Sequence, residues 1–204
     1  MQNQYQHRLN VPLFEILKSI PETIGIRLNE EPFYQVVAKD EEFELRHYAP
    51  QIRAEVTEVG STFNEFRENA FKKLANYIFG GNVLKENIPM TTPVLQYGFE
   101  TASRAMSFIL PARYNIYNLP APQDNEVKIV EVPSYHAAVM TYHGNNNEKK
   151  IEQHFNRLIR WLKDRPDVEY LDHMTCAQYD APFVIPFIKK NEVMIMVHIK
   201  WAQL

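Results

Sequence analysis

The chain has 204 residues, of which 45% are hydrophobic, so it can bury a substantial core in one large domain or two small ones. A formal net charge of -3 and scattered basic residues give no electrostatic reason to expect a nucleic-acid partner. The single cysteine, Cys176, excludes an intramolecular disulfide, and no stretch resembles a signal peptide or a membrane span. We therefore expect a cytoplasmic protein without membrane insertion, in which Cys176 is a small packed residue.

The N-terminal part of the sequence, residues 1–29, is expected to form a polar lead and a short amphipathic helix that ends at Pro21. Residues 30–204 are expected to form a single domain. Runs rich in aromatic and β-branched residues, separated by short breaks, predict the first strands of this domain. These runs cover 33–38, 43–48 and 52–59.

Two helices are predicted from their start and stop signals. Thr62 and Glu65 have the spacing of a capping box, and the helical pattern that follows ends at Gly80. In the second half, the strand-like runs 127–132 and 136–142 precede a run of asparagines at 145–147 that favours another helix start. Further strands are predicted at 104–110 and 192–199. These elements indicate an α+β fold, a mostly antiparallel sheet curled into a distorted β-barrel with two flanking helices.

The two halves of the chain also resemble each other at a constant offset of 84 residues, without gaps. A repeat of this kind predicts two pseudo-symmetric β-α-β units, about 33–110 and 117–199. Eight positions are identical in both units: Ala54/Ala138, Thr57/Thr141, Gly60/Gly144, Glu68/Glu152, Phe71/Phe155, Leu74/Leu158, Met90/Met174 and Thr91/Thr175. The repeated Met-Thr pair is interpreted as a requirement of the fold, with threonine bonding to backbone and methionine packing.

No motif of a known catalytic site is present, so the sequence does not predict an enzyme. Seven histidines are present, and none has the spacing of a zinc site. His47 differs from the others in its surroundings, because strand alternation places Phe43, Leu45 and His47 on one face. Two interpretations remain open for His47: an imidazole that ligates the iron of a flat apolar ligand, or a rim histidine bonded to backbone.

Several segments in order resemble the SOUL haem-binding protein family over residues 31–197. The segments that carry the resemblance are 31–37, 43–48, 77–82, 88–94 (Ile-Pro-Met-Thr-Thr-Pro-Val), 119–122, 127–133 and 191–193 (Asn-Glu-Val). The resemblance implies a distorted β-barrel with two helices, built as two related halves, and a haem or porphyrin ligand. In one branch of the family the histidine of Glu-x-Arg-His-Tyr is the proposed axial ligand, which corresponds to His47 within Glu44–Tyr48. Another branch lacks this histidine and is proposed to hold tetrapyrroles in an apolar groove. Position 47 aligns with Glu131 in the second repeat unit, so the imidazole is not repeated.

The apolar, proline-containing segment 182–188, followed by Lys189 and Lys190, has two interpretations. In the first interpretation the segment is a groove wall and its lysines reach haem propionates. In the second, which we favour, the segment caps one end of the barrel.

Together these observations predict a haem- or porphyrin-binding protein that stores, carries or buffers tetrapyrrole without turnover, with His47 as the iron ligand. Its partner is then a small-molecule tetrapyrrole, and no protein partner is predicted. The alternative is a ligand-sensing or protein-interaction module of the gyrase-inhibitor-like effector-binding type that does not bind haem, since that fold has a similar duplicated architecture.

Overall fold

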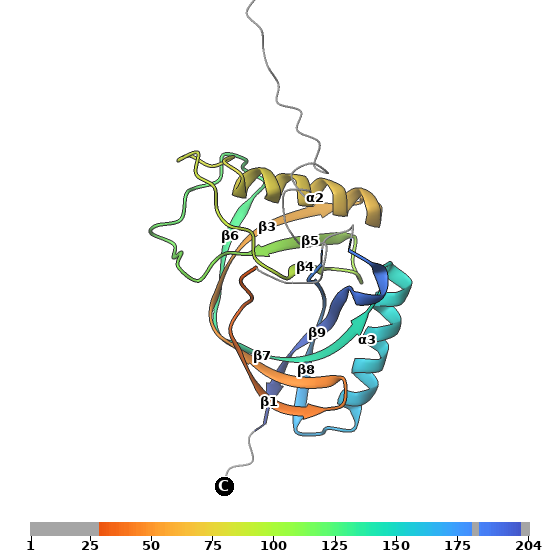
Figure 1. The fold of residues 1–204 in the computed structure, drawn as a ribbon. Helices are drawn as coiled ribbons and strands as arrows, with labels where there is room; N and C mark the ends of the chain where they lie inside the picture. Colours follow the sequence, from red (N-terminus) through yellow and green to blue (C-terminus); the bar gives the residue numbers. More distant parts are fainter. Residues whose placement is uncertain (1–28, 181–183, 201–204) are drawn as a thin grey trace, which may run out of the picture.

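The structure, a computed structural model, describes residues 29–180 and 184–200 (Figure 1). The helix predicted within 1–29 lies outside these ranges. The elements in chain order are β1 (Tyr34–Asp40), β2 (Phe43–Tyr48), β3 (Gln51–Val59), α2 (Phe63–Ile78), β4 (Val94–Tyr97), β5 (Ser103–Ile109), β6 (Lys128–Val132), β7 (Tyr135–His143), α3 (Glu148–Lys163), β8 (Val168–Gln178), the short 3-10 helix η1 (Pro186–Ile188) and β9 (Lys190–Ile199).

Nine strands form one sheet in the order β1-β2-β7-β9-β8-β4-β5-β3-β6, and neighbouring strands pair antiparallel. The sheet curls into a half-barrel, and both long helices lie on its outer side (Figure 1). This arrangement confirms the predicted α+β class, with a curled antiparallel sheet and two flanking helices.

Helix α2 begins at the predicted capping box. The Thr62 backbone N–H donates to Glu65 Oε2 at 3.1 Å, and the Glu65 backbone N–H donates to Thr62 Oγ1 at 3.4 Å. These bonds satisfy backbone donors that the first helical turn leaves without partners. The apolar side of α2, including Phe66 and Leu74, packs against strands β3 and β5, where Val56 is fully buried.

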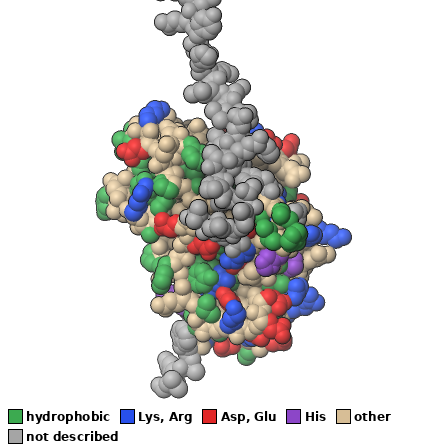
Figure 2. All heavy atoms as spheres, viewed as in Figure 1, with side chains coloured by type: hydrophobic (Ala, Val, Ile, Leu, Met, Phe, Trp, Pro, Cys, Tyr) green, Lys and Arg blue, Asp and Glu red, His purple; other side chains and the backbone are tan. Residues whose placement is uncertain are grey.

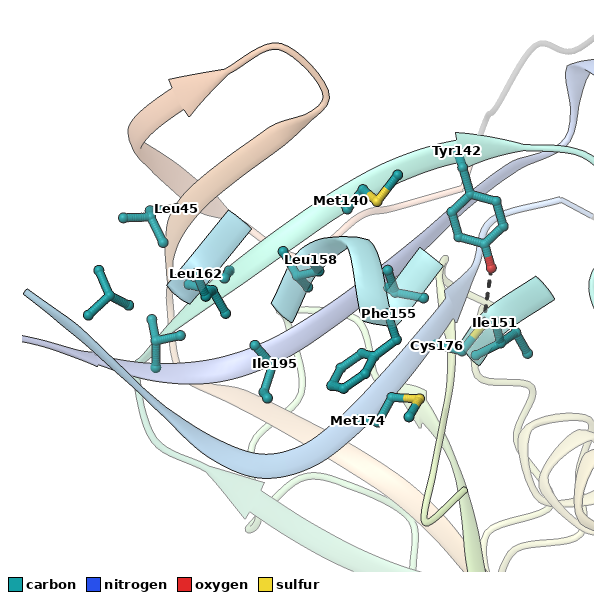
Figure 3. Close-up of a cluster of buried hydrophobic side chains, with 14 of the residues drawn as sticks. Leu45, Met140, Tyr142, Ile151, Phe155, Leu158, Leu162, Met174, Cys176 and Ile195 are labelled. Atoms are coloured by element: carbon teal, nitrogen blue, oxygen red, sulfur yellow. Dashed lines mark hydrogen bonds between the residues drawn. The ribbon is translucent and has the colours of Figure 1, made fainter. Parts of the chain in front are cut away.

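Helix α3 covers the other part of the outer face (Figure 1). Its N-cap is Asn147, whose side chain accepts the Lys150 backbone N–H at 2.9 Å. Figure 3 shows Leu158 and Leu162 of this helix among side chains of the sheet, including Leu45 and Ile195. Burial of this apolar stripe holds α3 on β2, β7, β8 and β9.

Two strands were not predicted, β4 and the eleven-residue β8. Met174 and Thr175 lie within β8, whereas Met90 and Thr91 precede β4 in a segment without regular structure. The repeated pair therefore occupies two different backbone settings. The packing interpretation still agrees with the structure, because the Thr91 hydroxyl donates to the Ile109 carbonyl and Met174 is 8% exposed.

The order strand, strand, helix, strand, strand occurs twice, as β2-β3-α2-β4-β5 and as β6-β7-α3-β8-β9. Strand β7 begins and ends 84 residues after β3, at 135 and 143 compared with 51 and 59. A symmetry relation in space between the two units stays a prediction.

Acidic and basic side chains are interspersed on the face shown in Figure 2. Within the ranges that the structure describes, no helix has the length and apolar character needed to cross a membrane. Cys176 is fully buried, and burial raises the pKa of its thiol to about 12. This confirms the prediction that Cys176 is a packed residue.

Candidate functional site

His47 lies on β2 directly opposite His136 of β7. Their ring centroids are 4.6 Å apart and the ring planes are inclined by 30°. Both side chains are half-buried. Among residues 29–180 and 184–200, no hydrogen bond involves the His47 ring nitrogens. A half-exposed imidazole without such a bond is available to an external ligand.

The structure has the alternation predicted for β2, with Phe43, Leu45 and His47 on one face. Phe43 and Leu45 pack against α3, and His47 does not. Leu45 is 6% exposed within the core beneath α3, and Phe43 stacks on Trp161 of α3 with centroids 5.1 Å apart. These two residues therefore anchor β2 to the helix. His47 is the next residue on the same face, and it is more exposed than Leu45.

The pKa of His136 is lowered, chiefly by burial and also by the charges of His47 and His198. Each cause disfavours the protonated ring. The His136 side chain is therefore a neutral imidazole at physiological pH.

The inner face of the same strands carries a buried polar network. Arg46 donates to both carboxylate oxygens of Glu192, at 3.0 and 3.1 Å, and Tyr179 donates to the same carboxylate at 2.7 Å. Burial would raise the pKa of the Glu192 carboxyl, but Arg46 and the other donors more than offset it, so the pKa is lowered. This network is internally satisfied and joins β2 to β9 inside the curl.

Lys189 and Lys190 lie at the other end of this region. The Lys189 ammonium donates to Asn145 Oδ1 at 3.0 Å, and the Lys190 ammonium lies 3.8 Å from the Tyr179 ring centroid and 3.3 Å from Glu192 Oε1. Lys190 precedes Val197, the β9 partner of His136, by seven residues, which is about 23 Å of strand. The structure therefore does not gather the two lysines and His47 around one point.

A cavity of about 630 Å³ opens near the turns that follow β2 and β6. Its wall is mostly apolar, and of the charged residues it includes only Glu30, Glu31 and Glu131, with no lysine or arginine among the described lining residues. His47 is not part of this wall, although Ala49, two residues further on, is. The full lining is Glu30, Glu31, Pro32, Phe33, Ala49, Pro50, Gln51, Ile52, Thr91, Ile109, Leu110, Pro111, Ala112, Tyr114, Glu131, Val132 and Pro133.

The sequence interpretation missed this cavity, although one signal was available. Pro32, Pro50, Pro111 and Pro133 each stand just outside a strand, and all four line the cavity. Proline is favoured where a strand starts or stops, because it cannot donate to the ladder of backbone hydrogen bonds. The sequence does not show that these four strand ends meet.

No group of three or more histidine, cysteine or acidic side chains within the described ranges is arranged to hold a metal ion.

Comparison with known proteins gives one family and several relatives. The sequence pattern of the SOUL heme-binding protein family matches residues 29–196. Heme-binding protein 1 of Xenopus tropicalis is 28% identical over 180 residues, covering 83% of this chain and 91% of that protein. Heme-binding protein 2 of Homo sapiens is 23% identical over 160 residues, covering 76% and 77%.

Solved structures with little sequence similarity share the fold. The C-terminal domain of EcmrR superposes with a TM-score of 0.61 at 10% identity, covering 81% of this chain and 98% of that chain. SAV2435 bound to tetraphenylphosphonium superposes with a TM-score of 0.50 at 9% identity, covering 77% and 94%.

Proposed function

The chain belongs to the SOUL heme-binding protein family, and on this premise we propose that it binds an iron tetrapyrrole, with haem as the first candidate. The proposed role is to store, carry or buffer the tetrapyrrole in the cytoplasm without turnover. Relatives named heme-binding protein 1 and 2 support the ligand class. No constellation of catalytic residues on the described part of the chain argues for a reaction.

One observation carries the proposed iron ligation, namely the availability of His47. Its imidazole stands on a strand, is half-exposed, and has no hydrogen bond from the described residues. A neutral imidazole is a common axial ligand of haem iron. Phe43 and Leu45 contribute indirectly, because their packing beneath α3 fixes the strand that presents His47.

The haem is proposed to lie against the outer sheet face at His47 and not in the cavity. Haem carries two propionate groups, and Glu30, Glu31 and Glu131 in the cavity wall would repel them. Lys189 and Lys190 are left out of the proposed site, since about 23 Å of strand separates Lys190 from the position of His47.

Titration of the purified full chain with haemin, followed by Soret absorption, tests this proposal. Wild-type protein and His143→Ala, a variant of an exposed histidine at the far end of β7, are expected to bind with the same saturation curve. His47→Ala is expected to lose the spectrum of an imidazole-ligated iron. Equal spectra and affinities for wild type and His47→Ala would remove His47 from the site. The absence of saturable binding by wild type would reject haem as the ligand.

A second candidate function is favoured by the cavity, which suits an apolar molecule without negative charge. This corresponds to the effector-binding alternative, and SAV2435, a structure of the same fold, is bound to the apolar cation tetraphenylphosphonium. Titration with tetraphenylphosphonium would then show saturable binding that Glu131→Gln weakens roughly two- to five-fold, as expected for one exposed charge. Glu152→Gln, on the exposed side of α3, is the matched control. No binding, or equal binding by both variants, would reject this site.

A further inference from the structure

His47 and His136 are held in a geometry that a small ion can use without haem. They are direct partners in the antiparallel β2–β7 register, so their Cβ atoms lie on one face of the sheet, typically about 5 Å apart. Their ring centroids are 4.6 Å apart. The two imidazoles thus stand side by side on neighbouring strands, with no intervening residue.

The distances required for chelation are close to those already present. A transition-metal ion binds imidazole nitrogen at about 2.0–2.1 Å, so two nitrogens at adjacent coordination positions are about 3 Å apart. Starting from rings inclined by 30° with centroids 4.6 Å apart, rotation of the His47 side chain can bring one of its ring nitrogens to about that separation from a nitrogen of His136. The backbone does not need to move, because β2 and β7 pair directly and each also pairs with a neighbour on its other side.

The surroundings hold the pair in place. Strand β2 is fixed on one side by β1, with Gln35 opposite His47, and β7 is fixed by β9, with Val197 opposite His136. Two residues further along the same pair of strands, on the same face, Leu45 and Ala138 are buried beneath α3. A site on such strands loses little conformational freedom when it binds an ion.

From this geometry we infer that His47 and His136 form a two-histidine chelating site for a free divalent transition-metal ion. Two imidazole nitrogen ligands with open remaining positions favour Cu²⁺, followed by Ni²⁺, over the hard ions Mg²⁺ and Ca²⁺. The site does not depend on tetrapyrrole binding. It shares His47 with the proposed haem site, however, so a free metal ion and haem iron compete for one imidazole.

Titration of the full chain with Cu²⁺ tests the inference, with electron paramagnetic resonance reporting the number of nitrogen ligands. Wild type is expected to bind one equivalent with two imidazole nitrogens. His47→Ala and His136→Ala are each expected to weaken Cu²⁺ binding about tenfold or more. Loss of a residue that only hydrogen-bonds to a metal ligand already has an effect of about this size, and loss of the ligand itself should cost at least as much. His143→Ala, the control, retains the wild-type affinity.

Wild-type affinity for Cu²⁺ in either His47→Ala or His136→Ala would overturn the chelate. Circular dichroism of each variant establishes that the fold is intact. Haemin titration of the same variants separates the two proposals, because His136→Ala removes the chelate and leaves the proposed haem ligand in place. Loss of Cu²⁺ binding in both variants, with unchanged haemin binding in both, supports the chelate and rejects haem ligation by His47.

Discussion

Arg46 of β2 and Glu192 of β9 form a doubly hydrogen-bonded ion pair inside the curl of the sheet, although β7 lies between their strands. The Arg46 side chain is 3% exposed and the Glu192 side chain is fully buried. Glu44 also contacts the Arg46 guanidinium, at 2.7 Å. The pair ties together strands from the two halves of the chain.

Removing one partner of this pair is expected to destabilise the protein strongly. Glu192→Gln keeps the side-chain shape but leaves the Arg46 charge with Glu44 as its remaining carboxylate, and we expect a loss of about 3 kcal/mol in the free energy of unfolding. Urea denaturation at neutral pH measures it. Glu169→Gln, which removes an exposed partner of Lys200, serves as the control and should leave the free energy of unfolding close to that of wild type. A Glu192→Gln effect as small as this control would contradict the assignment.

The same carboxylate predicts a dependence of stability on pH. The pKa of Glu192 in the folded protein is below its ordinary value of 4.5, so the ionised carboxylate stabilises the fold fully above that value. This contribution is lost as the pH falls from 4.5 through the lower folded pKa. The difference in unfolding free energy between wild type and Glu192→Gln should therefore be constant at higher pH and shrink below pH 4.5. A difference that stays constant throughout the acid range would show that the pKa is not lowered.

The contact between Phe43 and Trp161 predicts a measurable coupling between β2 and α3. Their rings are stacked with an interplanar angle of 11°. A double-mutant cycle with Phe43→Ala and Trp161→Ala should give an interaction energy of about 1 kcal/mol in unfolding experiments. Additive effects of the two substitutions would indicate that the stack contributes nothing beyond burial of each ring.

Two glycines with positive φ, Gly60 and Gly98, differ in the room that is available for a Cβ atom. Replacing each with alanine separates the cost of backbone strain from the cost of steric overlap. Gly60 has φ 79°, and an added Cβ there would have no heavy atom within 4 Å, so Gly60→Ala should cost about 1 kcal/mol from strain alone. Gly98, in the β4–β5 turn, has φ 84°, and an added Cβ would meet the Ser103 carbonyl oxygen and lie 3.1 Å from Arg104 Cα. Gly98→Ala should therefore cost at least about 1 kcal/mol more. Equal melting temperatures of the two variants would contradict this.

Local signals in the sequence predicted most of the elements. The capping pair Thr62 and Glu65 and the asparagine run 145–147, of which Asn147 is the cap, indicate both helix starts, because these side chains act on backbone groups within the first turn. Alternation in β2 likewise predicted which residues share a face with His47. Strand β8 was missed because charged residues such as Glu169 and Asp172 interrupt its apolar pattern.

The candidate site depended on contacts that no local pattern reveals. No local pattern distinguishes His136 from the other histidines, and only the β2–β7 register brings it to His47. One of the two interpretations of segment 182–190 has Lys190 reach haem propionates, and in the structure its ammonium lies near Tyr179 and Glu192. Pairing over a separation of 89 residues, as for His47 and His136, is set by tertiary structure and not by sequence periodicity.

The strand order has a consequence for how the chain folds. Strand β2 pairs with β7, β3 with β6, and β4 with β8, so strands from the first half complete their ladders with strands from the second. Neither half holds all the backbone partners that its own strands require. The paired strands are far apart in the sequence, so the chain must close long loops, at a cost in conformational entropy, before these strands make contact. We therefore expect folding to be slow compared with a helical bundle of this size. Fragments produced by cleavage between β5 and β6 would therefore be expected to regain structure only when mixed.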